Sequence, residues 1–494
     1  MSVGFRPAGR KPTDKKRNVP YRRRQKLAYV YILYLIRSSI IEERDITTSA
    51  DGKRLYPTKA PRERAFLVGA ELTGDRSLWR AEDSLQELAL LADTAGLEVV
   101  GSMYQRIKHP YPKHFIGPGK IEELAALREE CQYDLVVFDD ELTPAQTRNI
   151  EADLQTRVLD RTGLILDIFA THARTHEGRI QVELAQYKYL LPRLRRQWTH
   201  LERQAGGGGA SAGGVVGLRG PGETQLELDR RLITRRIALL DEQLRDIHRH
   251  RELYRARRRQ SGIPIIALVG YTNAGKSTLL NALSGANVRA EDRLFATLDP
   301  TTRQIALPGG QQILLTDTVG FIQKLPTQLV ASFRATLEEI SEADLLLHVL
   351  DITHANAAQQ TTTVMETLKD LHADTQPILT VLNKVDRLDG VDEAEVGRLA
   401  EALGLPDDYV AVSAARGWGL ETLLKHVETS LGERMATVEA FIPYKRNDLV
   451  ALWRQRGIVS EERYEADGTH LTGRVPAAVA GQIEPFLVNG HNGR

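Results

Sequence analysis

A glycine-rich stretch from Gly270 to Ser277 carries the clearest chemistry in the chain. It has the spacing G-x-x-x-x-G-K-S/T, follows an apolar run over Ile263 to Val269 and precedes a helical pattern over Thr278 to Leu283. Glycines let the backbone wrap closely around a polyphosphate, so that N–H groups and a helix N-terminus face the anion. Lys276 would neutralise the β- and γ-phosphates, and the Ser277 hydroxyl would hold Mg²⁺. The predicted phosphate-loop residues are Gly270, Tyr271, Thr272, Asn273, Ala274, Gly275, Lys276, Ser277 and Thr278.

Two later stretches are predicted to contact the γ-phosphate end of a bound nucleotide. In the first, Thr297 would complete the Mg²⁺ ligands, although Thr301 and Thr302 lie close enough to keep the choice of threonine open. In the second, which follows a predicted strand, Asp317 would act on Mg²⁺ from outside its direct ligands, and the Gly320 N–H would reach the γ-phosphate. The residues concerned are Phe295, Ala296, Thr297, Leu298, Asp299, Asp317, Thr318, Val319 and Gly320.

The base-recognition residues come after two further predicted strands, Ile378 to Leu382 and Tyr409 to Val412. A carboxylate at Asp386 would accept hydrogen bonds from guanine N1–H and the 2-amino group, which adenine lacks. The loop that follows the second strand would offer backbone N–H groups to guanine O6. These motifs predict GTP and GDP as ligands, held by Asn383, Lys384, Val385, Asp386, Ser413, Ala414 and Ala415.

One residue departs from the arrangement of Ras-like GTPases. Phe321 follows Gly320, where a glutamine would orient the attacking water. Hydrolysis is therefore expected to be slow unless another group supplies this function. Asn273 suggests a K⁺ ion, because in several GTPases an asparagine at this place helps to hold potassium. Lys276, Gly320 and Asn273 are candidates for catalysis, and none is assigned.

A helical arm is predicted between the two α/β regions. One heptad seam runs through Ile180, Leu184, Tyr187, Leu191, Leu194, Trp198 and Leu201, and a second through Leu226, Ile233, Ile237, Leu240, Leu244 and Ile247. Pro192 should kink the first helix. The connecting glycine-rich loop over residues 206–222 is expected to be mobile. Between Asp229 and Arg259 there are eleven Arg against five acids, which suits a polyanion such as structured RNA, or an ordinary solvated coiled coil.

The expected fold class is α/β and multidomain. A basic, disordered extension over residues 1–62 precedes an N-terminal parallel α/β domain over 63–172 and the antiparallel helical arm over 173–260. A GTPase domain with a mostly parallel sheet spans 261–433, and a small α+β C-terminal module spans 434–494. In the first domain, strands are predicted over Arg64 to Leu72, Leu97 to Met103, Asp134 to Phe138 and Arg157 to Leu159.

Composition narrows the class of protein. The 494 residues have a net charge of +1, so any basic surface must be local. The single cysteine, Cys131, excludes an internal disulfide framework and fits a reducing compartment. The apolar run over Leu27 to Ile36 is too short to span a bilayer and lacks a cleavage site. We therefore expect a cytoplasmic protein without stable membrane insertion, with peripheral membrane association left open.

Taken together, the motifs resemble the HflX family of translation-associated GTPases. GYTNAGKST, FATLDPTTR (295–303), DTVGF (317–321), NKVD (383–386) and SAA (413–415) match its GTPase domain. RGPGETQLELDRR (219–231) is similar to its signature beside the glycine loop, and residues 158–186 resemble its N-terminal domain. The likeness covers about residues 63–434.

The resemblance implies a partner and an activity. HflX proteins bind the 50S ribosomal subunit and 70S ribosomes in the GTP state and are linked to splitting or rescuing stalled ribosomes under stress. Residues 180–259 would then meet 23S rRNA, Mg²⁺ would be the cofactor, and the chain would be a monomer in solution. ATP use through the first domain stays open. The alternatives are a GTP-gated scaffold with little turnover, favoured by Phe321, and a regulator of RNA modification, for which no metal or cysteine centre is visible.

Overall fold

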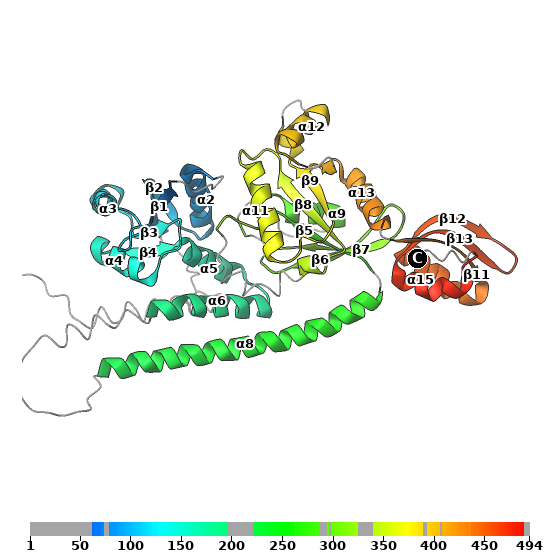
Figure 1. The fold of residues 1–494 in the computed structure, drawn as a ribbon, viewed down its shortest axis with the longest axis horizontal. Coiled ribbons are helices and arrows are strands. Elements are labelled where there is room, and N and C mark those ends of the chain that lie inside the picture. Colours follow the sequence, from blue (N-terminus) through cyan, green and yellow to red (C-terminus); the bar gives the residue numbers. More distant parts are fainter. Residues whose placement is uncertain are drawn as a thin grey trace, which may run out of the picture. The chain divides into compact units, whose positions relative to one another are not determined.

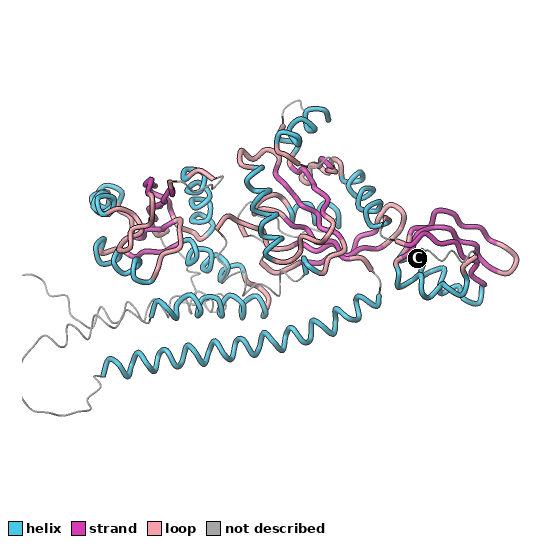
Figure 2. The backbone as a smooth tube through the Cα atoms, in the orientation of Figure 1, coloured by secondary structure: helices cyan, strands magenta, loops and turns pink. Residues whose placement is uncertain are grey.

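The computed structural model describes residues 62–73, 79–194, 221–261, 263–285, 294–295, 298–324, 339–388, 393–405, 408–433 and 435–488. Within these ranges the side chains of 194, 221–229, 252–261, 393–395 and 477–478 are not described. The described chain forms three β-sheets and a helical hairpin, and the elements can be followed by colour and type (Figures 1 and 2). No helix among the described residues is both long and apolar enough to cross a membrane.

The first sheet has four parallel strands in the order β2-β1-β3-β4. They are β1 (Arg64–Leu72), β2 (Glu98–Ile107), β3 (Leu135–Phe138) and β4 (Arg157–Asp160). Helices α3 (Pro118–Cys131) and α4 (Pro144–Leu154) pack on one face through Leu124 and Ile150, whereas α2 (Ala81–Thr94) and α5 (Arg161–His172) contact the sheet separately from that core. The expected parallel α/β arrangement is confirmed. Helix α5, which Asp160 caps by accepting from the Gly163 N–H, had not been predicted as an element.

The helical hairpin consists of α6 (His176–Leu194) and α8 (Pro221–Ser261). Their seam joins Ile180 and Leu184 to Leu240 and Leu244, with Tyr187, Ile237 and Ile247 packed against it. These residues belong to the two predicted heptad seams. Pro192 lies inside α6, two residues before the described part of this helix stops at Leu194, so the predicted kink stays a prediction. Trp198, Leu201, the side chains of Leu194 and Leu226, and the glycine-rich loop lie outside what the structure describes.

The second sheet has six strands in the order β10-β9-β8-β5-β7-β6. Its strands are β5 (Ile265–Val269), β6 (Thr301–Ala306), β7 (Gln312–Asp317), β8 (Leu345–Asp351), β9 (Ile378–Asn383) and β10 (Tyr409–Ala411). All neighbours are parallel except β6, which pairs antiparallel with β7. The sequence analysis did not predict β6, because its polar run T-T-R-Q lacks a strand pattern.

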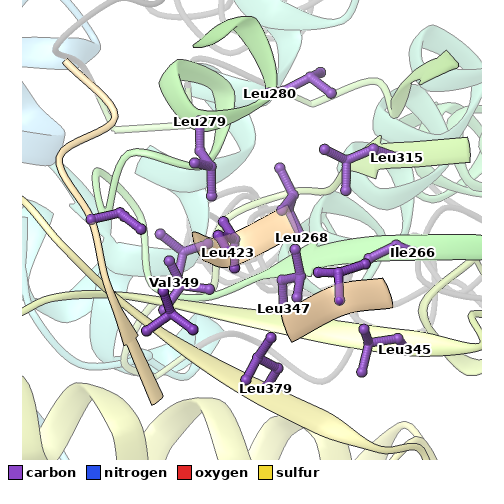
Figure 3. Packing of buried hydrophobic residues seen from close by; sticks show 14 of the residues in the cluster. Ile266, Leu268, Leu279, Leu280, Leu315, Leu345, Leu347, Val349, Leu379 and Leu423 are labelled. Atoms are coloured by element: carbon purple, nitrogen blue, oxygen red, sulfur yellow. The ribbon is translucent and has the colours of Figure 1, made fainter. Parts of the chain in front are cut away.

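Helices cover both faces of this sheet. On one face α9 (Lys276–Ser284) and α13 (Leu420–Gly432) share a core with the strands, in which Leu279 and Leu280 lie over Leu268, Leu315 and Leu347 (Figure 3). On the other face Leu350 and Leu382 pack against α11 (Ala357–Asp370) and α12 (Glu393–Ala402). With helices on both faces, ligands are expected at the edge where the parallel strands end.

The third sheet is antiparallel, in the order β11-β13-β12. Strands β11 (Ala436–Pro443), β12 (Ile458–Tyr464) and β13 (Gly468–Val475) pack against α14 (Asn447–Arg456) and α15 (Ala477–Ile483) around the fully buried Trp453. A short 3₁₀ helix, η3 (Glu484–Phe486), follows α15. The elements are those of a small α+β unit.

Candidate nucleotide site

The loop between β5 and α9 has the backbone that a phosphate loop needs. Gly270 and Gly275 have φ values of 148° and 97°, and a side chain on either would collide, with the Val349 carbonyl or with the Asn383 amide respectively. Asn273 also has a positive φ, 61°. The loop ends at the N-terminus of α9, where unpaired N–H groups favour an anion.

The charged groups of the loop face one another at the end of β5. The ammonium of Lys276 is buried and donates to the carbonyl oxygens of Gly270 at 3.0 Å and Tyr271 at 2.8 Å. Burial lowers the pKa of Lys276 to about 8, and the Asp317 carboxylate opposes this shift. A phosphate placed here would restore the charged form of the ammonium, because an opposite charge favours it.

Ser277 and Asp317 form a donor set that suits a magnesium ion. The Ser277 hydroxyl donates to the Asp317 carboxylate over 2.6 Å, and Asp317 is buried at the end of β7. The hydroxyl oxygen of Ser277 is a hard ligand of the kind that Mg²⁺ prefers, and the Asp317 carboxylate would orient it from outside the direct ligands. Neighbouring Thr318 is occupied in another way, since its hydroxyl donates to the Leu268 carbonyl at 2.6 Å.

The segment after Asp317 is tied to the phosphate loop by a short parallel β-bridge. The Phe321 N–H donates to the Gly270 carbonyl at 3.1 Å, and the Thr272 N–H donates to the Phe321 carbonyl at 2.8 Å. Gly320 is consequently packed against Thr272 and Lys276, leaving no space for a side chain. The ring of Phe321 is fully buried.

The predicted base-recognition residues meet at the ends of β9 and β10. Asn383 bridges the phosphate loop and the later loop, donating to the Ala274 carbonyl at 2.9 Å and accepting from the Ala414 N–H at 3.0 Å. The Ser413 hydroxyl donates to Asp386 over 2.6 Å, which orients that carboxylate. Lys384 forms an ion pair with Asp351 at 2.8 Å. An oriented carboxylate is the acceptor that selection of guanine requires. The N–H groups of Ser413, Ala414 and Arg416 are bonded within the protein.

The predicted switch segment is described only in part. Phe295 packs edge-on against Phe169 of α5 with 4.7 Å between ring centroids, and Asp299 accepts from the N–H groups of Arg174 and Thr175 at 2.9 Å. Leu298 is buried. Ala296 and Thr297 lie outside the described residues, so the choice among Thr297, Thr301 and Thr302 stays a prediction. Thr301 and Thr302 lie in β6, where the Thr302 hydroxyl bonds to that of Thr316 at 2.9 Å.

A buried polar cluster beside the phosphate loop had not been predicted. Arg161 of α5 forms an ion pair with Glu87 of α2. It forms a second ion pair, of 2.6 Å, with Asp139, which follows β3. Glu87 also accepts the hydroxyl of Tyr271, and that hydroxyl accepts the Gln323 N–H at 2.8 Å. The only sequence signal was the position of Asp139 after a buried parallel strand, where polar groups often serve a site.

The cluster continues through the residues that follow Phe321. Lys324 forms ion pairs of 2.6 Å with both Asp139 and Asp140. Ser84 donates to Asp139 at 2.7 Å, and its hydroxyl lies 3.1 Å from Oε1 of Gln323. Burial alone would raise the pKa of Asp139, but Arg161 and Lys324 hold that pKa below its ordinary value. These contacts join α2, α5 and β3 to the loop that carries the nucleotide motifs.

Parts of the chain match the models of known protein families. Three family models match, described as GTP-binding GTPase N-terminal over residues 82–170, GTP-binding GTPase Middle Region over 172–258 and 50S ribosome-binding GTPase over 265–384. Among solved structures, a GTP-binding protein from Sulfolobus solfataricus in complex with GDP is 27% identical, with 75% of this chain and 99% of that chain covered at a TM-score of 0.39.

Curated relatives extend over most of the chain. GTPase HflX of Caldanaerobacter subterraneus is 43% identical over 428 residues, which are 87% of this chain and 94% of the relative. GTPase HflX of Escherichia coli K12 is 42% identical over 407 residues, which are 82% and 92% of the two chains. With a phosphate loop, a guanine motif and relatives that match along nearly their full length, the chain belongs to the HflX family of GTPases.

Proposed function

We propose that this GTPase associates with the 50S ribosomal subunit and with 70S ribosomes in its GTP state, and splits or rescues stalled ribosomes. The observation that carries the proposal is the basic outer surface of α8. Arg230, Arg231 and Arg235 are exposed and form no ion pair with another described side chain. Exposed arginines along a long helix suit the phosphates of a structured RNA.

Other arginines of α8 serve the hairpin itself. Arg236 forms an ion pair of 2.8 Å with Glu183 of α6. Arg251 forms an ion pair of 2.9 Å with Glu177, also of α6. The helix therefore divides its positive charge between a structural side and an outward side. The name of the matching family model, 50S ribosome-binding GTPase, supports the ribosome as the source of the RNA.

Within the nucleotide site we assign roles as the motifs suggest. Lys276 and the Gly320 N–H hold the γ-phosphate, and Asp386 with the Ser413 loop selects guanine. Ser277 would hold Mg²⁺, with Thr297 as a second ligand, and the ion would neutralise charge that develops on the phosphates. We retain the hypothesis that Asn273 helps to hold a K⁺ ion. Equal rates of GTP turnover in K⁺ and Na⁺ buffers would reject this hypothesis.

Cosedimentation with ribosomal subunits tests the proposal. The intact protein is expected to pellet with 50S subunits in the presence of a non-hydrolysable GTP analogue and to stay in the supernatant with GDP. The variant Lys276→Ala should lose the analogue-dependent fraction, because it lacks the cation at the phosphates. Binding to 50S subunits that ignores the nucleotide, or no binding in either state, would contradict a GTP-dependent ribosome factor.

The outer face of α8 is tested in the same assay. Arg231→Glu together with Arg235→Glu should weaken pelleting more than tenfold, by replacing attraction to phosphates with repulsion, and the defect should grow smaller as salt is raised. Arg236→Gln provides the matched control, since this arginine pairs within the hairpin. An unchanged double variant would show that this surface does not meet the ribosome.

A further inference from the structure

The phosphate loop contains a buried hydroxyl without a partner. Thr272 is 6% exposed, and its Oγ1 forms no hydrogen bond with any residue in the described part of the chain. The N–H of the same residue is used, because it donates to the Phe321 carbonyl at 2.8 Å. A buried hydroxyl left unpaired costs stability, so a partner that arrives with the nucleotide or with water is expected.

The position of this side chain relative to the nucleotide motifs follows from the space around Gly320. A methyl group placed on Gly320 would lie 2.8 Å from Cγ2 and 2.9 Å from Cα of Thr272, and 3.1 Å from Nζ of Lys276. Three groups thus converge on one point: the methyl group of Thr272, the glycine and the ammonium of Lys276. Gly320 and Lys276 are the residues assigned above to the γ-phosphate, so Thr272 lies at the γ-phosphate end of the loop.

Other polar groups of this segment are already occupied. The ring of Phe321 is buried and both its backbone groups bond to the phosphate loop. Gln323 is the glutamine nearest to Phe321 in the sequence. Its backbone N–H donates to the Tyr271 hydroxyl, and its Oε1 lies 3.1 Å from the Ser84 hydroxyl. Among these described residues, the Thr272 hydroxyl is the polar side chain that retains its full hydrogen-bonding capacity.

We propose that Oγ1 of Thr272 accepts a hydrogen bond from the attacking water and holds that water against the γ-phosphorus. This is the task that a glutamine after Gly320 performs in Ras-like GTPases, and Phe321 cannot perform it. A hydroxyl is suited to it because its oxygen can accept a hydrogen bond from the water without carrying a charge. The inference rests on the proposed placement of the nucleotide.

Thr272 is unchanged by the reaction that it assists. The water oxygen forms a bond to the γ-phosphorus, and the bond from that phosphorus to the β–γ bridging oxygen breaks. The electron pair of the broken bond leaves on GDP, and both protons of the water end on inorganic phosphate. The contribution of Thr272 is orientation alone, so it is a water-positioning residue.

Two substitutions in the full-length protein separate the hydroxyl from the rest of the side chain. Thr272→Val keeps the shape and removes the hydroxyl, whereas Thr272→Ser keeps the hydroxyl and removes the methyl group. We expect Val to lower kcat for GTP hydrolysis on the order of tenfold to a hundredfold, the range that one hydrogen bond supplies, and Ser to stay within about threefold of the original rate. Each is assayed in K⁺ and in Na⁺ buffer, so that any effect of Asn273 is scored separately.

Two further readouts distinguish water positioning from a structural role. The affinity for a fluorescent GTP analogue should be unchanged in both variants, because the Thr272 N–H bonds to Phe321. The Tm of Thr272→Val without nucleotide should be equal to or above that of the original protein, since the substitution removes an unpaired buried hydroxyl. A lower Tm together with weaker analogue binding would point to a structural role and overturn the inference.

The rates decide the remaining outcomes. A Val variant that hydrolyses GTP at the original rate would refute the role of the hydroxyl while leaving the nucleotide placement intact. A Ser variant as slow as Val would assign the effect to methyl packing against Gly320, which also overturns the inference. If the original protein binds no GTP analogue, or if Lys276→Ala binds it equally well, the nucleotide placement itself fails.

Discussion

At the residue scale, His348 is an ionisable side chain in an environment that disfavours its charged form. It lies in the middle of β8, fully buried, and neither ring nitrogen has a hydrogen-bond partner among the described residues. Burial, assisted by the positive charge of Lys276, lowers the pKa of His348 to about 4. The folded protein therefore keeps a neutral imidazole under conditions in which an unfolded chain already binds a proton.

This difference predicts a loss of stability in mild acid. Between the ordinary histidine pKa and about 4, only the unfolded state is protonated at His348, so the free energy of unfolding falls as the pH drops. The loss should reach about 2 kcal/mol near pH 5 and about 3 kcal/mol near pH 4. In His348→Leu, the fall in Tm between pH 7 and pH 5 should be clearly smaller than in the original protein.

The exposed His426 of α13 provides the matched control for this measurement. His426→Leu should leave the pH dependence of Tm as it is in the original protein. If His348→Leu shows the same acid sensitivity as His426→Leu, then another group accounts for the destabilisation. Both variants are measured without nucleotide, because a bound ligand would add its own pH dependence to Tm.

At the element scale, the helical hairpin owes its pairing to one apolar seam. Leu240 is fully buried against α6, whereas its neighbour Leu239 in the same helix is 45% exposed. A long helix with few hydrophobic contacts is stabilised mainly by such packing. The two leucines therefore share sequence context and helix propensity and differ in burial.

Leu240→Ala is expected to destabilise the hairpin by about 2–5 kcal/mol, the range for truncating a buried leucine. Leu239→Ala should change stability by no more than about 0.5 kcal/mol. Limited proteolysis should cleave α8 faster in the first variant, while affinity for a GTP analogue stays unchanged in both. Equal protease resistance of the two variants would contradict the α6–α8 seam.

At the scale of the whole molecule, the buried Arg161 cluster connects the first sheet and its helices to the nucleotide site. Glu87 and Tyr271 are 184 positions apart in the sequence, yet the tyrosine hydroxyl donates to the glutamate. The carboxylates of Glu87 and Asp139 raise the pKa of Arg161 against the effect of burial, so the guanidinium stays charged. Removing one member would leave a buried charge without compensation.

Arg161→Ala should consequently lower stability by about 3–5 kcal/mol. Arg157, which forms a solvent-exposed pair with Glu63, offers a matched control, and Arg157→Ala should cost about 1 kcal/mol or less. Differential scanning calorimetry of both variants checks the prediction. Similar Tm values for the two would show that the cluster is not a structural connection.

Several features were predictable because they are local. The order of the nucleotide motifs, the parallel strands of both α/β sheets and the heptad seams all depend on neighbours within a few residues or on short periods. Strand β6 was missed because its residues are polar, and it exists through its antiparallel pairing with β7. Helix α5 was missed because it follows β4 directly, with Asp160 serving both as the last strand residue and as the helix cap.

The sequence by itself determined that this chain binds a guanine nucleotide, since the glycine loop, the aspartate and the guanine motif are each read within a few consecutive residues. Only the tertiary structure decided which groups surround those motifs. The contact of Thr272 with Gly320 and the bond from Tyr271 to Glu87 join segments that are distant along the chain. Their pairing depends on how sheets and helices pack, and no local pattern of residue types encodes it.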